Sequence, residues 1–157
     1  MDPSNSRCTC FLLRRAARRT SQVYDRALAP LGLSLNEYSI LRRARAPAAL
    51  GELAERVGMD RSTLSRNLRP LLAAGWIEQR RGDDARRRLV AATAAGRQLL
   101  RRAEPLWQRA QTQLEAWAGA DAVAALHGQL QHLEDVLPLP GASHENPGVP
   151  ARTSAGT

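Results

Sequence analysis

Arginine and hydroxyl side chains are concentrated in one short stretch of the chain. The candidate contact residues in it are Arg61, Ser62, Thr63, Ser65, Arg66 and Arg69. A guanidinium group can form two parallel hydrogen bonds with a phosphate or with the edge of a guanine base, so this stretch is suited to bind a polyanion. At about 100° per residue, Leu64, Leu68 and Leu71 fall on one side of a helix, opposite these arginines. We expect Arg66 to contact a base and Arg69 a phosphate; the alternative for any single arginine is an ordinary solvated surface charge.

The residues before this stretch predict a shorter helix and a tight turn. Leu53, Ala54 and Val57 mark one apolar helix face, Gly58 suits the positive φ that ends a helix, and Asp60 can cap the next one. The pattern is typical of a helix-turn-helix whose second helix carries the arginines. Pro70 is expected to bend that helix or to end it.

A hairpin with a basic tip is predicted directly after the second helix. Two β-type runs, residues 76–80 and 86–92, flank a turn at residues 81–85. Alternation places Arg88, Val90 and Ala92 on one side of the second run. A hairpin in this position indicates a winged helix, in which the second helix enters a major groove and the wing reaches a minor groove or the backbone.

Asp84 carries a negative charge, which is unexpected in a turn whose only role is to attract phosphate. We interpret it as pairing with a nearby guanidinium and holding the wing turn, which leaves Arg86 or Arg87 to point into a minor groove. The alternative is an ordinary turn aspartate.

In these residues the chain resembles the MarR family of bacterial transcription regulators. The matching features are residues 52–54, the turn around Gly58, residues 62–66, residues 71–75, the wing pattern of residues 84–86, and residues 92–93 with Gly96. The resemblance covers roughly residues 8–137. It implies a homodimer, and it implies the role of Asp84 given above. Arg88 and Ala92 depart from the family, which usually has an aliphatic residue and a leucine at these positions.

The charge of the chain is divided unevenly. Residues 1–112 hold 22 of the 23 basic residues and 10 of the 15 acids, a balance of +12, whereas residues 113–157 have a balance of −4. Every basic residue is arginine, which a genome-wide arginine bias would also explain. The charge favours double-stranded nucleic acid over an acidic protein partner.

Helices are expected on both sides of the winged helix. The first spans residues 8–29, and Ser34 with Glu37 forms a capping-box pattern for the next. Thr93 can cap a long helix to residue 118 that Pro105 should kink. Asp121 is expected to cap the last helix, which ends near residue 137.

The predicted fold is therefore mainly α (α+β), a winged helix-turn-helix with long N- and C-terminal dimerisation helices. Its regions are a flexible lead-in (1–7), a helical dimerisation region (8–33 and 93–137), the winged helix (34–92) and a disordered tail (138–157). The terminal helices carry more apolar surface than one winged helix can cover, which favours a homodimer. An intramolecular bundle is the alternative.

Two further groups of residues are candidate effector sites. Cys8 and Cys10 are too few for a structural zinc site, but near Arg7 and Arg14 either thiolate can be favoured and oxidised, for example to a disulfide with the other subunit. Two unreactive thiols are the alternative. Tyr24, Tyr38 and Trp107 can line a cavity for a small aromatic ligand, or simply belong to the core.

No catalytic arrangement or metal-ligand spacing stands out, so we expect neither an enzyme nor a cofactor. We expect no membrane-spanning or signal segment, and a cytoplasmic protein. The function hypothesis is a homodimeric, sequence-specific DNA-binding regulator, a repressor released from a pseudo-palindromic operator by a small ligand or by oxidation. The rival hypotheses are a winged-helix protein-interaction module, in which the arginines and the wing would not face solvent together, and a thiol-redox enzyme using the two cysteines.

Overall fold

The computed structural model describes residues 8–81 and 88–137. Its elements, in chain order, are α1 (Thr9–Leu28), the 3-10 turn η1 (Ala29–Leu31), α2 (Leu35–Arg43), β1 (Ala48–Ala49), α3 (Leu50–Val57), α4 (Arg61–Ala73), β2 (Ile77–Arg81), β3 (Arg88–Ala92), α5 (Ala94–Ala118) and α6 (Ala120–Val136). The chain forms two compact units that divide between Ala118 and Gly119, so α6 belongs to the second. The mainly α fold with a small sheet confirms the predicted winged helix.

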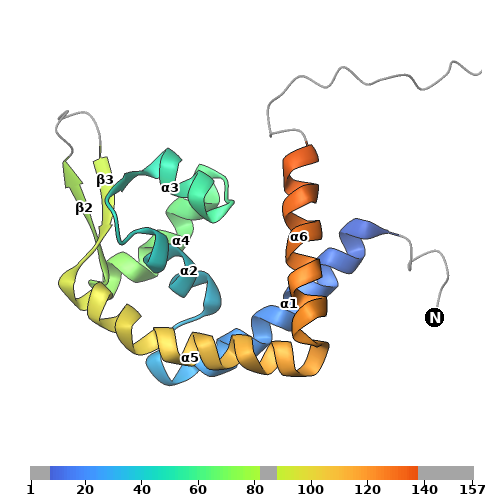
Figure 1. Ribbon diagram of the computed structural model, residues 1–157. Helices are drawn as coiled ribbons and strands as arrows, with labels where there is room; N and C mark the ends of the chain where they lie inside the picture. The colour runs from blue at the N-terminus through green and yellow to red at the C-terminus, as the bar shows by residue number, and fades with distance from the viewer. Residues whose placement is uncertain (1–7, 82–87, 138–157) are drawn as a thin grey trace, which may run out of the picture. The chain divides into compact units, whose positions relative to one another are not determined.

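Helices α2, α3 and α4 gather beside the β2–β3 hairpin, while α5 leads away from the hairpin and runs alongside α1 (Figure 1). The antiparallel sheet has the order β1-β3-β2, with Ala48 opposite Val90 and Ile77 opposite Ala92. Strand β1 was not predicted. Its two alanines become a strand only by pairing with β3, and local sequence does not specify that contact.

One apolar core joins the helices to the sheet. Its fully buried side chains include Leu28, Tyr38, Ile40, Leu41, Leu53, Leu64, Leu71 and Leu100. The three leucines expected on the inner face of α4 are all buried, which confirms the amphipathic pattern on which the helix-turn-helix was predicted. The core thus fixes α4 from behind and leaves its other face to solvent.

The predicted helix ends are largely confirmed. Ser34 and Glu37 form the complete capping box of α2, and Gly58 ends α3 at φ 69°. Thr93 accepts a hydrogen bond from the backbone NH of Gly96 at 3.0 Å, as expected for the cap of α5. Proline does not interrupt either helix that contains it: α4 continues past Pro70 to Ala73, and α5 runs through Pro105.

The expected cap of the last helix is wrong. Gly119 is the N-cap of α6, and Asp121 lies inside the first turn. Gly119 has φ 88°, a conformation that glycine adopts without strain, so the chain turns there and the helix begins one residue later. Asp121 still interacts favourably with the positive end of the helix dipole.

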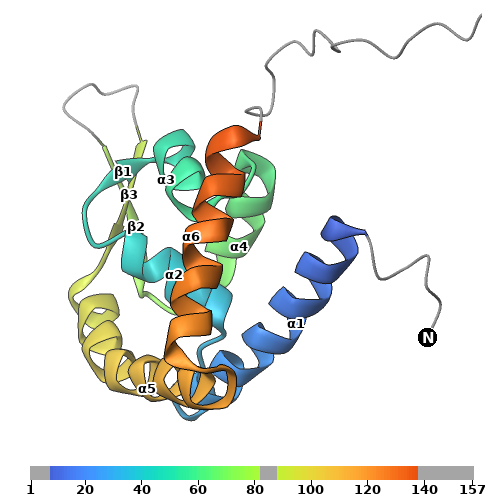
Figure 2. The ribbon, with the colours of Figure 1, turned by 45° about the vertical axis from the view of Figure 1, so that its right-hand side comes forward.

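Figure 2 shows the hairpin, α3 and α4 from a second side, with β1 joining the edge of β3. The predicted flexible lead-in (1–7), the predicted disordered tail (138–157) and the wing tip lie outside the described residues. The winged helix therefore positions two sets of described basic residues, one on α4 and one on the wing strands β2 and β3.

Candidate nucleic-acid interface

Asp60 organises the start of α4. Its carboxylate accepts hydrogen bonds from the backbone NH of Thr63 at 2.8 Å, from the Thr63 hydroxyl at 2.6 Å and from the Ser62 hydroxyl at 2.6 Å. These hydrogen bonds, first from the side chains of Ser62 and Thr63, lower the pKa of the Asp60 carboxyl well below its usual range. The helix start is thus already occupied by a fixed negative charge.

This network limits what the two hydroxyls can offer to a partner. Each gives its proton to Asp60, so each presents only lone pairs outward. The Thr63 hydroxyl also accepts from Arg66 Nη2 at 3.3 Å, which links that arginine to the cap. The hydroxyl oxygens of Ser62 and Thr63 can therefore accept a hydrogen bond, from Arg66 or from a base amino group. They are less suited to donate one to a phosphate.

The exposed face of α4 carries Ser65, Arg66 and Arg69 in the arrangement expected from helical periodicity. Arg61 differs, because its guanidinium lies over the start of α3. A Cβ built on Gly51 would meet Arg61 Nη2 at 2.7 Å. Because Gly51 has no side chain, the Arg61 guanidinium can pack against α3 at this position. Sequence periodicity alone could not predict this contact.

The ends of β2 and β3 that lead into the wing tip carry more charge than was predicted. Arg80, Arg81 and Arg88 are all exposed. Arg80 Nε donates to Glu78 Oε1 at 2.6 Å, and Arg88 Nη1 reaches Gln79 Oε1 at 3.5 Å. Sequence reasoning missed Arg81 and Arg88 as site residues; the hairpin register, which places them opposite each other, is the signal that identifies them.

The wing residues assigned from the sequence, Asp84, Arg86 and Arg87, lie outside the described residues. Among the described residues, the first turns of α4 and the wing strands present arginines to solvent together. This is the feature that favours DNA binding over a protein-interaction module.

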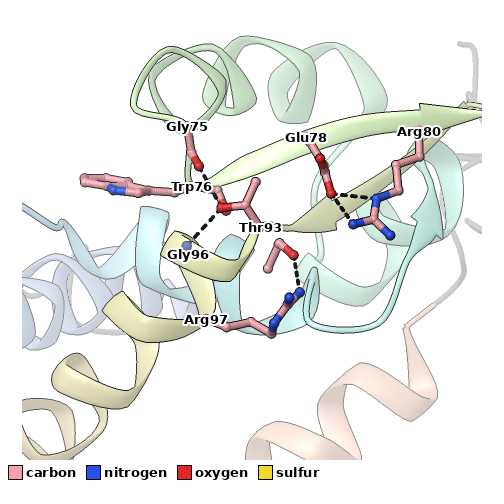
Figure 3. A network of polar contacts seen from close by, with 8 residues as sticks. Gly75, Trp76, Glu78, Arg80, Thr93, Gly96 and Arg97 are labelled. Carbon is pink, nitrogen blue, oxygen red and sulfur yellow. Dashed lines mark hydrogen bonds and ion pairs between the residues drawn. The ribbon is translucent and has the colours of Figure 1, made fainter.

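A polar network ties the base of the hairpin to α5. The Thr93 hydroxyl donates to the carbonyl oxygen of Gly75 at 2.7 Å, and Arg97 Nη1 donates to that of Ala92 at 2.6 Å (Figure 3). The backbone NH of Thr93 bonds the carbonyl of Trp76 at 3.0 Å. Rotation of the wing relative to α5 would break these contacts, so α5 can transmit movement to the wing.

Three aromatic residues lie together where α1, α2 and α5 meet. The Trp107 ring stacks on Tyr24 at 6.0 Å and on Tyr38 at 6.2 Å between centroids, and Arg42 lies over Trp107 at 5.3 Å. Burial, with a smaller effect from Glu104, raises the pKa of Tyr38 to about 12, and its hydroxyl donates to Glu104 at 3.1 Å. The sequence-predicted ligand residues are thus brought together, with their rings stacked on one another.

Cys8 and Cys10 are both exposed at the start of α1. They border an open hollow of about 720 Å³ that is lined mainly by arginines of the same helix, including Arg14 and Arg15. The guanidinium groups make this a cationic surrounding for the two thiols. Both thiols stand at the N-terminal end of α1.

Within the described ranges, no group of three or more histidine, cysteine or acidic side chains could hold a metal ion. No helix in residues 8–81 or 88–137 combines the length and apolar character needed to cross a bilayer.

Known proteins are similar to this chain in fold and in sequence. The family model described as "MarR family" matches residues 31–88, which contain the helix-turn-helix and most of the hairpin. HTH-type transcriptional regulator YwoH of Bacillus subtilis is 28% identical over 83 residues, 52% of this chain. The chain spans only 61% of that relative's length.

Two solved structures are similar over most of the chain. The M. tuberculosis transcriptional regulator MosR, solved in complex with DNA, is 37% identical with a TM-score of 0.70, and the match covers 82% of this chain and 97% of that one. CouR, a transcriptional repressor solved on a 23-mer DNA duplex, is 26% identical with a TM-score of 0.74, and the match covers 82% and 94%. It comes from Rhodococcus jostii RHA1.

The recognition-helix sequence, the hairpin that follows it and these similarities lead to one assignment. The chain belongs to the MarR family of winged-helix, DNA-binding transcriptional regulators.

Proposed function

We propose that this protein is a homodimeric repressor that binds a pseudo-palindromic operator and is released from it by an inducing signal. The observation that carries this proposal is the exposed face of α4, where Ser65, Arg66 and Arg69 stand beside the basic wing strands. CouR, a similar protein, is a repressor solved on DNA, which supports the same direction of control.

In this proposal α4 enters a major groove. Arg66 contacts a base edge, because it lies near the start of the recognition helix and its hydrogen bond to Thr63 holds its guanidinium group there. Arg69, one turn further, contacts a phosphate. Arg86 or Arg87 enters the adjacent minor groove while Asp84 holds the wing turn.

The dimer is supported by apolar surface that the single chain leaves uncovered. Phe11, Leu12 and Leu13 on the first half of α1 are exposed, although the second half of that helix is buried at Tyr24 and Leu28. Helix α6 likewise exposes Leu126 and Val136, and its C-cap residue Leu137 is also exposed. Large apolar side chains at both ends of the chain suit helices that interlock with those of a second copy.

Two features support regulated release. One is the stacked group of Tyr24, Tyr38 and Trp107, which links α1, α2 and α5. A small aromatic ligand that separates these rings would move the winged helices of the two subunits relative to each other. The other is the exposed pair Cys8 and Cys10 on α1. An oxidant such as peroxide would take two electrons and two protons from two thiols to form a disulfide, here with the other subunit.

Deletion of residues 121–157 tests the dimer and the operator together. The proposal expects a monomer by sedimentation that loses operator binding, although every proposed DNA-contacting residue remains. A truncated monomer that kept native operator affinity would contradict it.

Peroxide treatment of the full chain tests release by oxidation. A crosslinked dimer on a non-reducing gel and weaker DNA binding are expected, both reversed by a reductant. The oxidation proposal would be wrong if the double variant Cys8→Ser, Cys10→Ser responded to peroxide as the wild type does.

A further inference from the structure

A hollow of about 310 Å³ lies between helix α4 and the β2–β3 hairpin. Leucine and valine side chains form its apolar floor. Its polar rim is made by Ser65 and Arg69 from α4 and by Gln79 and Arg88 from the strands. None of the described residues that line the hollow is acidic. Two guanidinium groups from different elements therefore border one small space.

The hairpin register concentrates charge on this side of the sheet. Arg81 is directly opposite Arg88, and Gln79 is directly opposite Val90, so all four lie on the face that borders α4. Like charges directly opposite each other in an antiparallel pair destabilise it. The nearest acid on β2, Glu78, lies on the other face, where it pairs with Arg80. Among the described residues, the α4-facing side thus carries an excess of positive charge.

We propose that Arg69 and Arg88 hold one DNA backbone phosphate between them at the mouth of this hollow, with the Ser65 hydroxyl as a further donor. A phosphate oxygen accepts charge-assisted hydrogen bonds from guanidinium groups, so an anion between Arg69 and Arg88 is attracted by both. Because one ligand joins α4 to the wing strand, it fixes the wing relative to the recognition helix. The inference rests on the proposed function only in taking DNA as the source of the phosphate.

This assignment gives Arg88 a role that its strand position alone does not suggest. In the part of the hairpin that the structure describes, Arg88 Nη1 reaches the Gln79 side chain at 3.5 Å, the outer limit of a hydrogen bond. Arg88 lies at the rim of the hollow and opposite Arg81, so a bound anion would offset the repulsion between these two guanidinium groups.

The salt dependence of binding to a mixed-sequence duplex tests the shared phosphate without requiring the operator. Each phosphate contact contributes about 0.9 to the slope of log affinity against log salt concentration. Arg69→Gln and Arg88→Gln should each weaken binding about tenfold. The double variant lacks two charges in each subunit, yet its slope should fall by about 0.9 per bound subunit, the value for one phosphate, or about 1.8 for a bound homodimer. It should unfold at the wild-type temperature or higher, since the Arg81–Arg88 repulsion is removed.

Arg80→Gln is the matched control, because Arg80 lies on the neighbouring strand of the hairpin but on the opposite face, paired with Glu78. Its slope should equal that of the wild type. A fall of about 1.8 per bound subunit, or about 3.6 for a homodimer, would mean two separate phosphates in each subunit. An unchanged slope would mean no contact. Either result overturns the shared site. If the wild type itself showed no salt-dependent duplex binding, the proposed function would fail instead.

A competition experiment with inorganic phosphate distinguishes a site for a DNA phosphate from a site for a free anion. Inorganic phosphate should displace the duplex equally from the wild type and the double variant when it replaces chloride at constant ionic strength. Stronger displacement from the wild type would identify a site for free phosphate and overturn the assignment to DNA.

Discussion

Gly96 lies where helix α5 begins, against Trp76, the residue that precedes strand β2. It is buried, and a Cβ added to it would lie 2.0 Å from the carbonyl oxygen of Trp76 and 3.1 Å from Leu41 Cδ1. Carbon and carbonyl oxygen normally approach no closer than about 3.3 Å, so Gly96→Ala must push α5 and the Trp76 backbone apart by about 1 Å. That carbonyl cannot move freely, because it accepts hydrogen bonds from the backbone and side chain of Thr93.

The size of the effect follows from three contributions. Overpacking a filled site costs about 1–3 kcal/mol, and a weakened hydrogen bond at Trp76 adds about 1 kcal/mol. Alanine offsets about 1 kcal/mol through its better helix propensity. The expected net loss is about 2 kcal/mol in the free energy of unfolding, or a fall in Tm of about 4–8 °C for a chain of this size.

Gly51→Ala is the matched control for this prediction. It is also a helical glycine with a close neighbour, but that neighbour is the flexible end of Arg61, at 2.7 Å, which can move aside. Thermal unfolding followed by circular dichroism should therefore show Gly51→Ala at or above the wild-type Tm. If Gly96→Ala unfolded at the wild-type Tm as well, the close backbone approach between α5 and the start of the wing would be refuted.

Two further predictions concern the recognition helix. Arg66→Ala should weaken operator binding by about 1–3 kcal/mol and relax the preference at one position of each half-site, while Arg69→Ala should weaken binding to all sequences more evenly; equal losses of Arg66→Ala on operator and random DNA in binding titrations would exclude a base contact. Because hydrogen bonds lower the pKa of Asp60 in the folded protein, its contribution to stability is fully present above its ordinary value of 3.8 and is lost as the pH falls below that value toward the folded pKa. The stability advantage of the wild type over Asp60→Asn should therefore shrink below about pH 4 in denaturant titrations, and a pH-independent difference would show that the carboxylate charge does not hold the cap.

Local sequence signals predicted the recognition helix well, and the reason is physical. Gly58 and Asp60 fix the turn and the cap through their own backbone and side-chain chemistry, and the spacing of Leu64, Leu68 and Leu71 specifies one buried face. These properties depend on neighbours within a few residues, so they are visible without the fold.

The parts that sequence could not predict depend on contacts between distant segments. The short strand β1 exists because Ala48 meets Val90, and the turned-back Arg61 depends on the missing side chain of Gly51. The charged face of the wing needs the register that places Arg81 opposite Arg88. Periodicity assigns a residue to a face of its own element, but it does not identify what lies across from that face.

Selection of bound duplexes from a random library by the full-length protein tests the central proposal most directly. Two recognition helices related by a two-fold axis must enter successive major grooves on one side of the duplex, about 34–36 Å apart. The enriched sequences should therefore form an inverted repeat with half-site centres about 10 base pairs apart, flanked by A·T-rich tracts where the wings meet narrow minor grooves. Enrichment of a single isolated half-site, or of no common sequence at all, would contradict a dimeric operator-binding repressor.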